Sequence, residues 1–311
     1  MNEEGINNFE YNKTLIDLNS INSFYDNVSR RDNDQMNKIR ENVIGAIINR
    51  KVPEKYYDIS SKWLDIKNCL ELWINKFKES NNITDDIKLK HKGGRSYPYD
   101  FEIIINNKVY KIEFKYNSKE IKSVVQFSSP MKPSKYMSSS YEEFFYDNYL
   151  QQIATKFNFP FPNRKDYLKQ VSQTKPKCIE EYCKLYYKGS TTSSRFEPDN
   201  VVAKEFNNIC NYYDKMSRVN FIETNELNIE LLSLYLVNQQ NNKIYMLYQD
   251  NVFYYETTNM DDYKIVSVEK YPIKYKFVTT SFNGVKLDIL LRWKNGNGLA
   301  QPAFQISYNK N

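Results

Sequence analysis

The fold of this chain is decided by the stretch Asp100-Phe101-Glu102-Ile103-Ile104-Ile105-Asn106-Asn107-Lys108-Val109-Tyr110-Lys111-Ile112-Glu113-Phe114-Lys115. Polar and apolar residues alternate on both sides of the Asn-Asn pair, which predicts two antiparallel strands joined by a two-residue turn. In that register Asp100 faces Glu113, and Lys115 shares the face of Glu113 because strand side chains alternate. The opposite face is apolar and consists of Phe101, Ile103, Ile105, Tyr110, Ile112 and Phe114.

Two carboxylates placed opposite each other need a compensating charge, because facing like charges destabilise a strand pair. Carboxylate oxygens are preferred ligands of Mg²⁺ and Mn²⁺. We therefore expect Asp100 and Glu113 to hold such an ion, with the ammonium of Lys115 beside it. The alternative is a solvated strand face. For Glu102 and Lys111, which also face each other, an ordinary cross-strand ion pair is the preferred interpretation.

These residues resemble the signature of the PD-(D/E)xK nuclease superfamily, whose members have restriction endonuclease-like folds. The signature is an Asp on one strand, often after a Pro, followed by Glu-x-Lys on the next. Here it corresponds to Pro98-Tyr99-Asp100, with Tyr99 between the Pro and the Asp, and to Glu113-Phe114-Lys115. The resemblance covers roughly residues 85 to 130.

The resemblance implies a catalytic role for several residues. Asp100, Glu113 and the carbonyl of Phe114 would hold Mg²⁺ or Mn²⁺, and Lys115 would orient or help to deprotonate an attacking water. A helix before the hairpin often brings a further Glu to the metal in this superfamily, and Glu41 is the candidate, although it lies off the apolar stripe of its helix. A solvated Glu41 is the alternative. Gln126 corresponds to a polar position near the site in several members.

The segments around the hairpin predict an α/β core over residues 31–175, with a mixed sheet flanked by helices. Helical spacing begins at Asp34 and again near Ser60–Glu79. Ile87–Lys92 is predicted to be a strand, Ile121–Phe127 a third strand beside the Glu113 strand, and Tyr141–Phe157 a helix. Residues 1–30 are Asn-rich and weakly periodic, and are expected to form a partly ordered N-terminal arm.

Residues 176–311 are predicted to form a β-rich C-terminal lobe, which either recognises the target or extends the core sheet. A helix is expected near Val201–Met216, followed by short strands separated by Asn- and Gly-containing turns. The predicted strands are Leu231–Val237, Lys243–Tyr248, Val252–Glu256, Tyr263–Val268, Lys274–Thr279, Val285–Trp293 and Ala303–Tyr308.

Two short segments are candidates for nucleic-acid contacts. Lys92 and Arg95 flank Gly93-Gly94, a turn that would let a phosphate backbone approach closely. Arg292 and Lys294 flank an aromatic residue beside a Gly-rich turn. The alternatives are a plain turn in the first case and a basic strand end in the second.

The composition limits the classes of function. The chain has 311 residues, 44 Lys and Arg against 38 Asp and Glu, and a formal net charge of +6, which favours polyanionic partners. Four cysteines without a CxxC pair and a single histidine, His91, make a zinc site hard to assemble. No signal peptide, long apolar run or GxxxxGK loop is present, so we expect a soluble, intracellular protein without ATP-driven translocation.

The sequence thus predicts a divalent-metal-dependent endonuclease that acts on DNA. Double-strand cutting commonly uses two sites, so a homodimer is part of this hypothesis. Two alternatives stay open. One is a nucleic-acid-binding protein without catalytic activity, and the other is a nuclease that acts on RNA.

Overall fold

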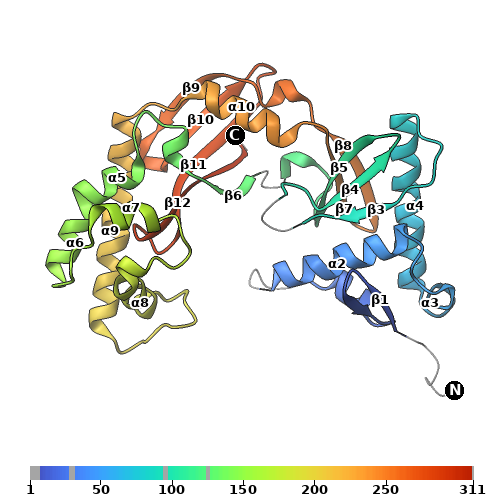
Figure 1. Cartoon of the computed structure of the whole chain (residues 1–311), viewed down its shortest axis with the longest axis horizontal. Helices are drawn as coiled ribbons and strands as arrows, with labels where there is room; N and C mark the ends of the chain where they lie inside the picture. The colour runs from blue at the N-terminus through green and yellow to red at the C-terminus, as the bar shows by residue number, and fades with distance from the viewer. Residues whose placement is uncertain (1–7, 28–31, 94–96, 124–126, 310–311) are drawn as a thin grey trace. The chain divides into compact units, whose positions relative to one another are not determined.

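The computed structural model describes residues 8–27, 32–93, 97–123 and 127–309, and the chain forms two compact units (Figure 1). Unit 1 consists of Met1–Val124 and Gln239–Asn259, and unit 2 of Val125–Asn238 and Met260–Asn311. These units differ from the division expected near residue 175. The reason is strand pairing, because each unit builds its sheet from two separate segments of the chain.

The hairpin at the centre of unit 1 has the predicted register. Strands β4 (Phe101–Ile105) and β5 (Lys108–Tyr116) pair antiparallel, with Phe101 opposite Ile112. Asn106 and Asn107 have φ values of 50° and 64°. Left-handed conformation at both central residues is the geometry of a type I′ turn, whose twist matches that of the strands. Just before β4, the N–H of Asp100 donates to the carbonyl of Ile112 at 2.9 Å. Ile112 is already the partner of Phe101, so the regular pairing ends at Phe101 and Asp100 lies just outside it.

The sheet of unit 1 is mixed, and its described strands run in the order β3 (Leu89–His91), β4, β5, β7 (Lys243–Gln249) and β8 (Val252–Thr257). The neighbour of β5 is β7, which runs parallel to it. The predicted third strand over Ile121–Phe127 is therefore wrong. Ile121–Ser123 forms a 3₁₀ turn, and the strand that follows belongs to unit 2. β7 suits the inner position because its side chains are buried on both faces, as is typical of parallel strands.

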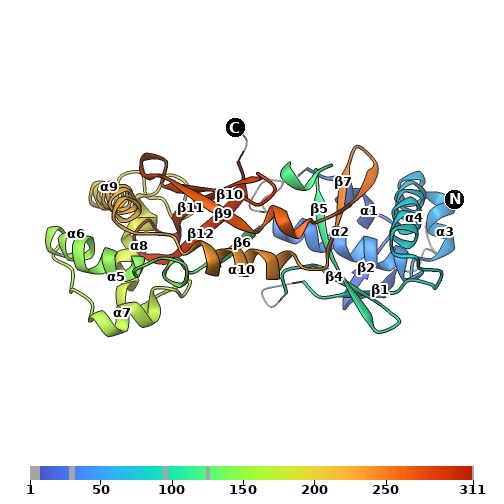
Figure 2. The same ribbon diagram turned by 90° about the horizontal axis from the view of Figure 1, so that it is seen from above.

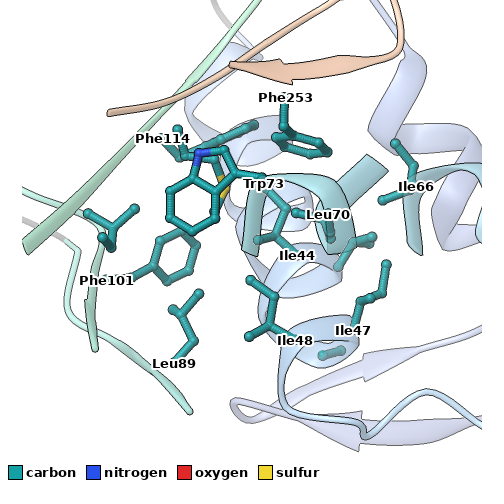
Figure 3. Close-up of a cluster of buried hydrophobic side chains, with 14 of the residues drawn as sticks. Ile44, Ile47, Ile48, Ile66, Leu70, Trp73, Leu89, Phe101, Phe114 and Phe253 are labelled. Atoms are coloured by element: carbon teal, nitrogen blue, oxygen red, sulfur yellow. The ribbon is translucent and has the colours of Figure 1, made fainter. Parts of the chain in front are cut away.

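One face of this sheet is covered by helices α2 (Asn33–Ile48) and α4 (Ser61–Asn81) (Figures 1 and 3). Figure 3 shows the apolar side chains of both helices meeting those of the strands, as the alternation in the hairpin predicts. Each of the six predicted apolar positions of the hairpin is at most 8% exposed. The labelled members of the cluster are Ile44, Ile47, Ile48, Ile66, Leu70, Trp73, Leu89, Phe101, Phe114 and Phe253.

The predicted N-terminal arm is folded where the structure describes it. Strands β1 (Phe9–Tyr11) and β2 (Thr14–Ile16) form a hairpin, and α1 (Ser20–Tyr25) follows. Ile16, Ile21 and Phe24 are at most 2% exposed and belong to the core of unit 1. These few apolar residues give no clear period in the sequence, but they pack against the rest of the unit. A short helix, α3 (Glu54–Ile59), connects α2 to α4.

A single glycine allows α2 to approach β3 closely. A Cβ atom at Gly45 would lie 2.5 Å from Nε2 of His91 and 2.6 Å from the hydroxyl of Tyr11, so no larger residue fits without rearrangement. Glu41 lies one turn before Gly45 and therefore on the same side of the helix. The close approach at Gly45 thus directs Glu41 toward the end of the sheet where β4 begins.

Unit 2 contains an antiparallel sheet whose described strands run in the order β6 (Phe127–Met131), β12 (Ala300–Tyr308), β11 (Lys286–Asn295), β10 (Lys276–Ser281) and β9 (Ile265–Tyr271) (Figure 2). The predicted strands of the last fifty residues are confirmed in existence, with shifted ends. The helices of this unit are α5 (Tyr141–Phe145), a π-helical turn at Tyr146–Leu150, α6 (Gln151–Lys156), α7 (Arg164–Gln170), α8 (Glu180–Gly189), α9 (Val201–Thr224) and α10 (Ile229–Gln240).

The strand predicted over Leu231–Val237 is wrong, because this segment lies in α10. Leu232 and Leu236 are fully buried, whereas Leu231 and Leu234 are 49% and 60% exposed. Burial at positions i and i+4 is the pattern of a helix. The coarse expectation of a mixed α/β protein with helices flanking a mixed sheet is confirmed. Within the described residues, no helix is both long and apolar enough to cross a bilayer.

The turn that sets the register can be tested by substitution at Asn107. A β-branched residue strains the left-handed conformation, so Asn107→Val should lower the free energy of unfolding by about 1 kcal/mol or more. Asn107→Gly, which removes the side chain but accepts positive φ, should unfold at the same urea concentration as the parent or a higher one. Equal midpoints for the two variants would contradict the turn geometry.

Candidate active site

The two predicted acids meet where β4 begins. Oδ2 of Asp100 accepts a hydrogen bond of 2.8 Å from the backbone N–H of Phe114 in β5. The N–H and C=O of one strand residue point to the same neighbouring strand, so the Phe114 carbonyl is directed to the side of Asp100. The Phe114 side chain lies in the core and is 4% exposed. The geometry of the strand therefore brings the predicted backbone ligand toward the predicted carboxylate ligand.

Two lysines contact the carboxylate of Glu113. Nζ of Lys115 donates to Oε1, and Nζ of Lys243 lies 3.6 Å from Oε2. Lys243 opens β7, and its side chain is 3% exposed, against 31% for Lys115. Burial opposes the charged form of Lys115, but the carboxylates of Glu113 and Asp100 outweigh it and raise the pKa of this lysine. Burial lowers the pKa of Lys243, and Glu113 offsets this only in part.

Glu41 completes a group of three acids. Its own burial, and then the charge of Asp100, raise the pKa of Glu41 to about 8. Burial, and then the charge of Glu113, raise the pKa of Asp100 to about 6. Both shifts have the sign expected for like charges held together away from water. The structure thus brings Glu41 into the same cluster as Asp100, Glu113 and Lys115, rather than leaving it on a solvated helix face.

The residue types of this cluster fit a hard divalent cation. The raised pKa values of Glu41 and Asp100 reflect burial and neighbouring carboxylates, and this negative charge is neutralised most directly by an ion such as Mg²⁺, which prefers oxygen ligands. Within the described part of the chain, the acids are not arranged as a ready-made set of three metal ligands. Both oxygens of Glu113 face lysine ammonium groups instead. Coordination by Glu113 would therefore require at least one of these ion pairs to open.

The predicted nucleic-acid contact Lys92 is engaged within the protein. Its Nζ lies 3.2 Å from Oε2 of Glu102, and the hydroxyl of Tyr99 donates to Oε1 of Glu102 at 2.6 Å. The predicted ion pair between Glu102 and Lys111 is therefore not formed, although the two residues face each other in the register. Lys111 instead donates to the carbonyl of Asn241 at 3.5 Å. Lys92, which follows β3, takes the place expected for Lys111.

The remaining predicted residues lie elsewhere. Arg95 and Gln126 fall outside the residues that the structure describes. Arg292 and Lys294 belong to β11 of unit 2. Trp293, the aromatic residue between them, is 4% exposed, and its indole N–H donates to the hydroxyl of Tyr141 at 3.1 Å. It is a core residue and is not accessible to a base.

Lys243 is the residue of this cluster that sequence reasoning missed. It stands 128 positions after Lys115, in a segment expected to belong to the C-terminal lobe. A signal was present, since Lys243 precedes the apolar run Ile-Tyr-Met-Leu-Tyr. Such a continuous run is typical of a strand buried on both faces in a parallel arrangement. The run does not show the register, however, and it is the pairing of Lys243 opposite Lys111 that brings its ammonium within reach of Glu113.

Comparisons of the chain with models of known protein families, with curated proteins and with solved structures find no match. Its function is therefore inferred from the motif and from the geometry of the cluster.

The charge cluster predicts a pH-dependent effect of Glu41→Gln on stability in EDTA. A carboxyl with a folded-state pKa near 8, against 4.5 ordinarily, binds its proton more tightly in the folded state. The parent should therefore lose stability as the pH rises from about 5 to about 8. The amide introduced by Glu41→Gln cannot ionise. The free energy of unfolding of the variant should therefore rise relative to that of the parent by more than about 1 kcal/mol over this range, since one pKa unit is worth about 1.4 kcal/mol.

Urea unfolding at several pH values would measure this difference. Glu71→Gln is the matched control, because Glu71 is exposed on α4 and lies outside the cluster. A difference between parent and Glu41→Gln that stays constant with pH would show that Glu41 is not held among the other acids.

Proposed function

We propose that this protein is a divalent-metal-dependent endonuclease that hydrolyses phosphodiester bonds in DNA. The observation that carries the proposal is the cluster of Asp100, Glu113 and Glu41 around Lys115, at the end of a mixed sheet with its opposite face packed on helices. The motif Asp…Glu-x-Lys supports the same function through its resemblance to the PD-(D/E)xK superfamily, and a restriction endonuclease-like core belongs to this proposal.

In this proposal Asp100, Glu113 and the carbonyl of Phe114 bind the metal, with Glu41 as a further acid beside them. A bound Mg²⁺ or Mn²⁺ would supply charge neutralisation at the phosphate and a more acidic water. The hydrogen bond from the Phe114 N–H holds the Asp100 carboxylate in place. A carboxylate fixed in this way does not have to be ordered during the reaction, which is a principal source of catalytic power in preorganised sites.

Lys115 acts through its positive charge in this proposal. Its raised pKa keeps it protonated at neutral pH, so it can orient the attacking water and stabilise the negative charge that grows on the phosphate. Lys243 stands behind Glu113 with a side chain that is 3% exposed. From there it holds the Glu113 carboxylate in position without contact with solvent, so it is a positioning residue in this proposal.

A nucleic-acid-binding protein without catalytic activity is the second candidate function, and the net charge of +6 favours it as well. Both functions predict DNA binding that weakens with salt. Only a nuclease nicks DNA in a reaction that requires Mg²⁺ or Mn²⁺ and stops in EDTA. An RNA substrate assayed in parallel distinguishes a nuclease that acts on DNA from one that acts on RNA.

The proposed roles predict distinct outcomes for single variants assayed on supercoiled plasmid with Mg²⁺. Asp100→Asn and Glu113→Gln should each lose cleavage by at least about a hundredfold, because a catalytic metal contributes several kcal/mol to the transition state and about 1.4 kcal/mol is tenfold. Lys115→Ala should lose cleavage to a similar extent while it still binds Mn²⁺, as measured by titration calorimetry.

Glu71→Gln removes an exposed acid of unit 1 and should cut at the parental rate. Circular dichroism of every variant checks that the fold is retained. An Asp100→Asn protein that cuts DNA as fast as the parent would refute the assignment of the site.

A further inference from the structure

Unit 2 contains a cavity of about 870 Å³ whose walls are strongly basic. Six of its lining residues are lysine or arginine, and one, Glu180, is acidic. That acid is already paired with Lys184 at 2.9 Å. The basic residues are Lys175, Lys177, Lys184, Arg195, Arg292 and Lys294.

The cations come from three separate segments of the chain. Lys175 and Lys177 lie between α7 and α8, Arg195 lies in the loop between α8 and α9, and Lys294 lies near the end of β11. These four side chains belong to exposed residues. Among the residues that the structure describes, no ion pair is recorded for Lys175, Arg195 or Lys294. The positive charge is therefore spread around the cavity and is available to a ligand.

The walls of the cavity are held in place by hydrogen bonds. The side chain of Asn297, in the turn after β11, donates to Oδ1 of Asn211 in α9 at 2.7 Å, and the hydroxyl of Tyr186 donates to the same atom at 3.3 Å. On the other side, the N–H of Gln301 donates to the carbonyl of Val171 at 2.6 Å. The turn after β11 and the helices α8 and α9 are thus tied to one another, and β12 is tied to the end of α7.

The lining also carries hydroxyl groups and an accessible aromatic residue. Ser190, Thr192, Ser193 and Ser194 come from the loop after α8, and Tyr187 is partly exposed. Hydroxyl groups and cations together are the side chains that contact phosphate and sugar in protein–nucleic acid complexes. Aromatic rings beside such cations give bases a surface for stacking.

We infer that this basic cavity binds the phosphodiester backbone of a nucleic-acid strand. Charge supplied from three segments suits a ligand that repeats its negative charge along its length, and a concave basic surface concentrates such a ligand. The choice of a polynucleotide rests on the proposed function, and the cavity extends that function by giving the substrate a second contact surface in addition to the acid cluster. The predicted contacts Arg292 and Lys294 would act here through their charge, without Trp293.

The test uses the full-length protein in EDTA, where cleavage cannot occur, and measures binding to a fluorescent duplex and a fluorescent single strand by anisotropy over a range of KCl. The groove variant, named for the basic cavity that it changes, is Lys175→Glu/Arg195→Glu/Lys294→Glu. The matched control is Lys165→Glu/Lys215→Glu/Lys286→Glu, which makes the same charge change at exposed lysines of unit 2 that do not line the cavity.

The groove variant should bind at least about tenfold more weakly than the control at about 100 mM salt, and its salt slope should fall by roughly 2 to 3, since each phosphate contact contributes about 0.7 to 0.9. The duplex and single-strand arms show which form enters the cavity. Equal binding by the groove and control variants would overturn the inference, as would failure of the parent to bind either probe, or displacement of the probe by ATP or polyglutamate at an equal concentration of negative charge.

The outcome is separable from that of the proposed function. If Asp100→Asn binds as the parent does and the groove variant does not, the cavity is a nucleic-acid site whether or not the parent cuts plasmid with Mg²⁺. If the parent cuts and the groove variant binds and cuts like the control, the nuclease proposal stands and the cavity has no part in it.

Discussion

The register of one hairpin is the constraint on which unit 1 depends. Left-handed conformation at Asn106 and Asn107 closes the turn in two residues, and a slip of one residue would move every side chain to the other face. In the observed register the apolar side chains of β4 and β5 face α2 and α4, while Asp100, just before β4, interacts with the charge of Glu113. The hydrophobic core and the acid cluster are therefore two results of the same pairing. The repulsion between the acids costs stability, and burial of the opposite face supplies the free energy that offsets it.

Two buried or partly buried acids of unit 1 differ in their surroundings, and the difference separates a structural ion pair from the candidate active site. Glu102 is buried beside a lysine and a tyrosine, and its interactions lower its pKa despite the cost of burial. Asp100 is partly buried among other acids, and its pKa is raised. The first acid is satisfied within the protein, whereas the second is held in a state that an added cation would relieve. This contrast between two acids two residues apart supports a structural role for Glu102 and a catalytic role for Asp100.

The sequence was sufficient to predict the hairpin, its turn, its apolar face and the meeting of Asp100 with Glu113 and Lys115, because all of these follow from contacts between residues close in the chain. It was insufficient where distant segments pair. The neighbour of β5 is β7 rather than the segment after the hairpin, and alternation alone does not choose between two candidate strands. Glu41 lies off the apolar stripe of α2, but this helix is buried on several sides, so the stripe marked only one of them. The strand predicted at the position of α10 is wrong because a short apolar run does not by itself show its period.

The parallel pairing of β5 with β7 has a consequence for synthesis of the protein. A ribosome completes the hairpin with its two acids well before it reaches Lys243, and the whole first segment of unit 2 is made in between. Contacts between such distant segments form late, because the intervening chain must first be ordered or looped out. The nascent chain therefore displays the acid pair without its inner lysine and without the central strand of the sheet. The acid cluster therefore gains its second lysine only after the whole first segment of unit 2 has been synthesised.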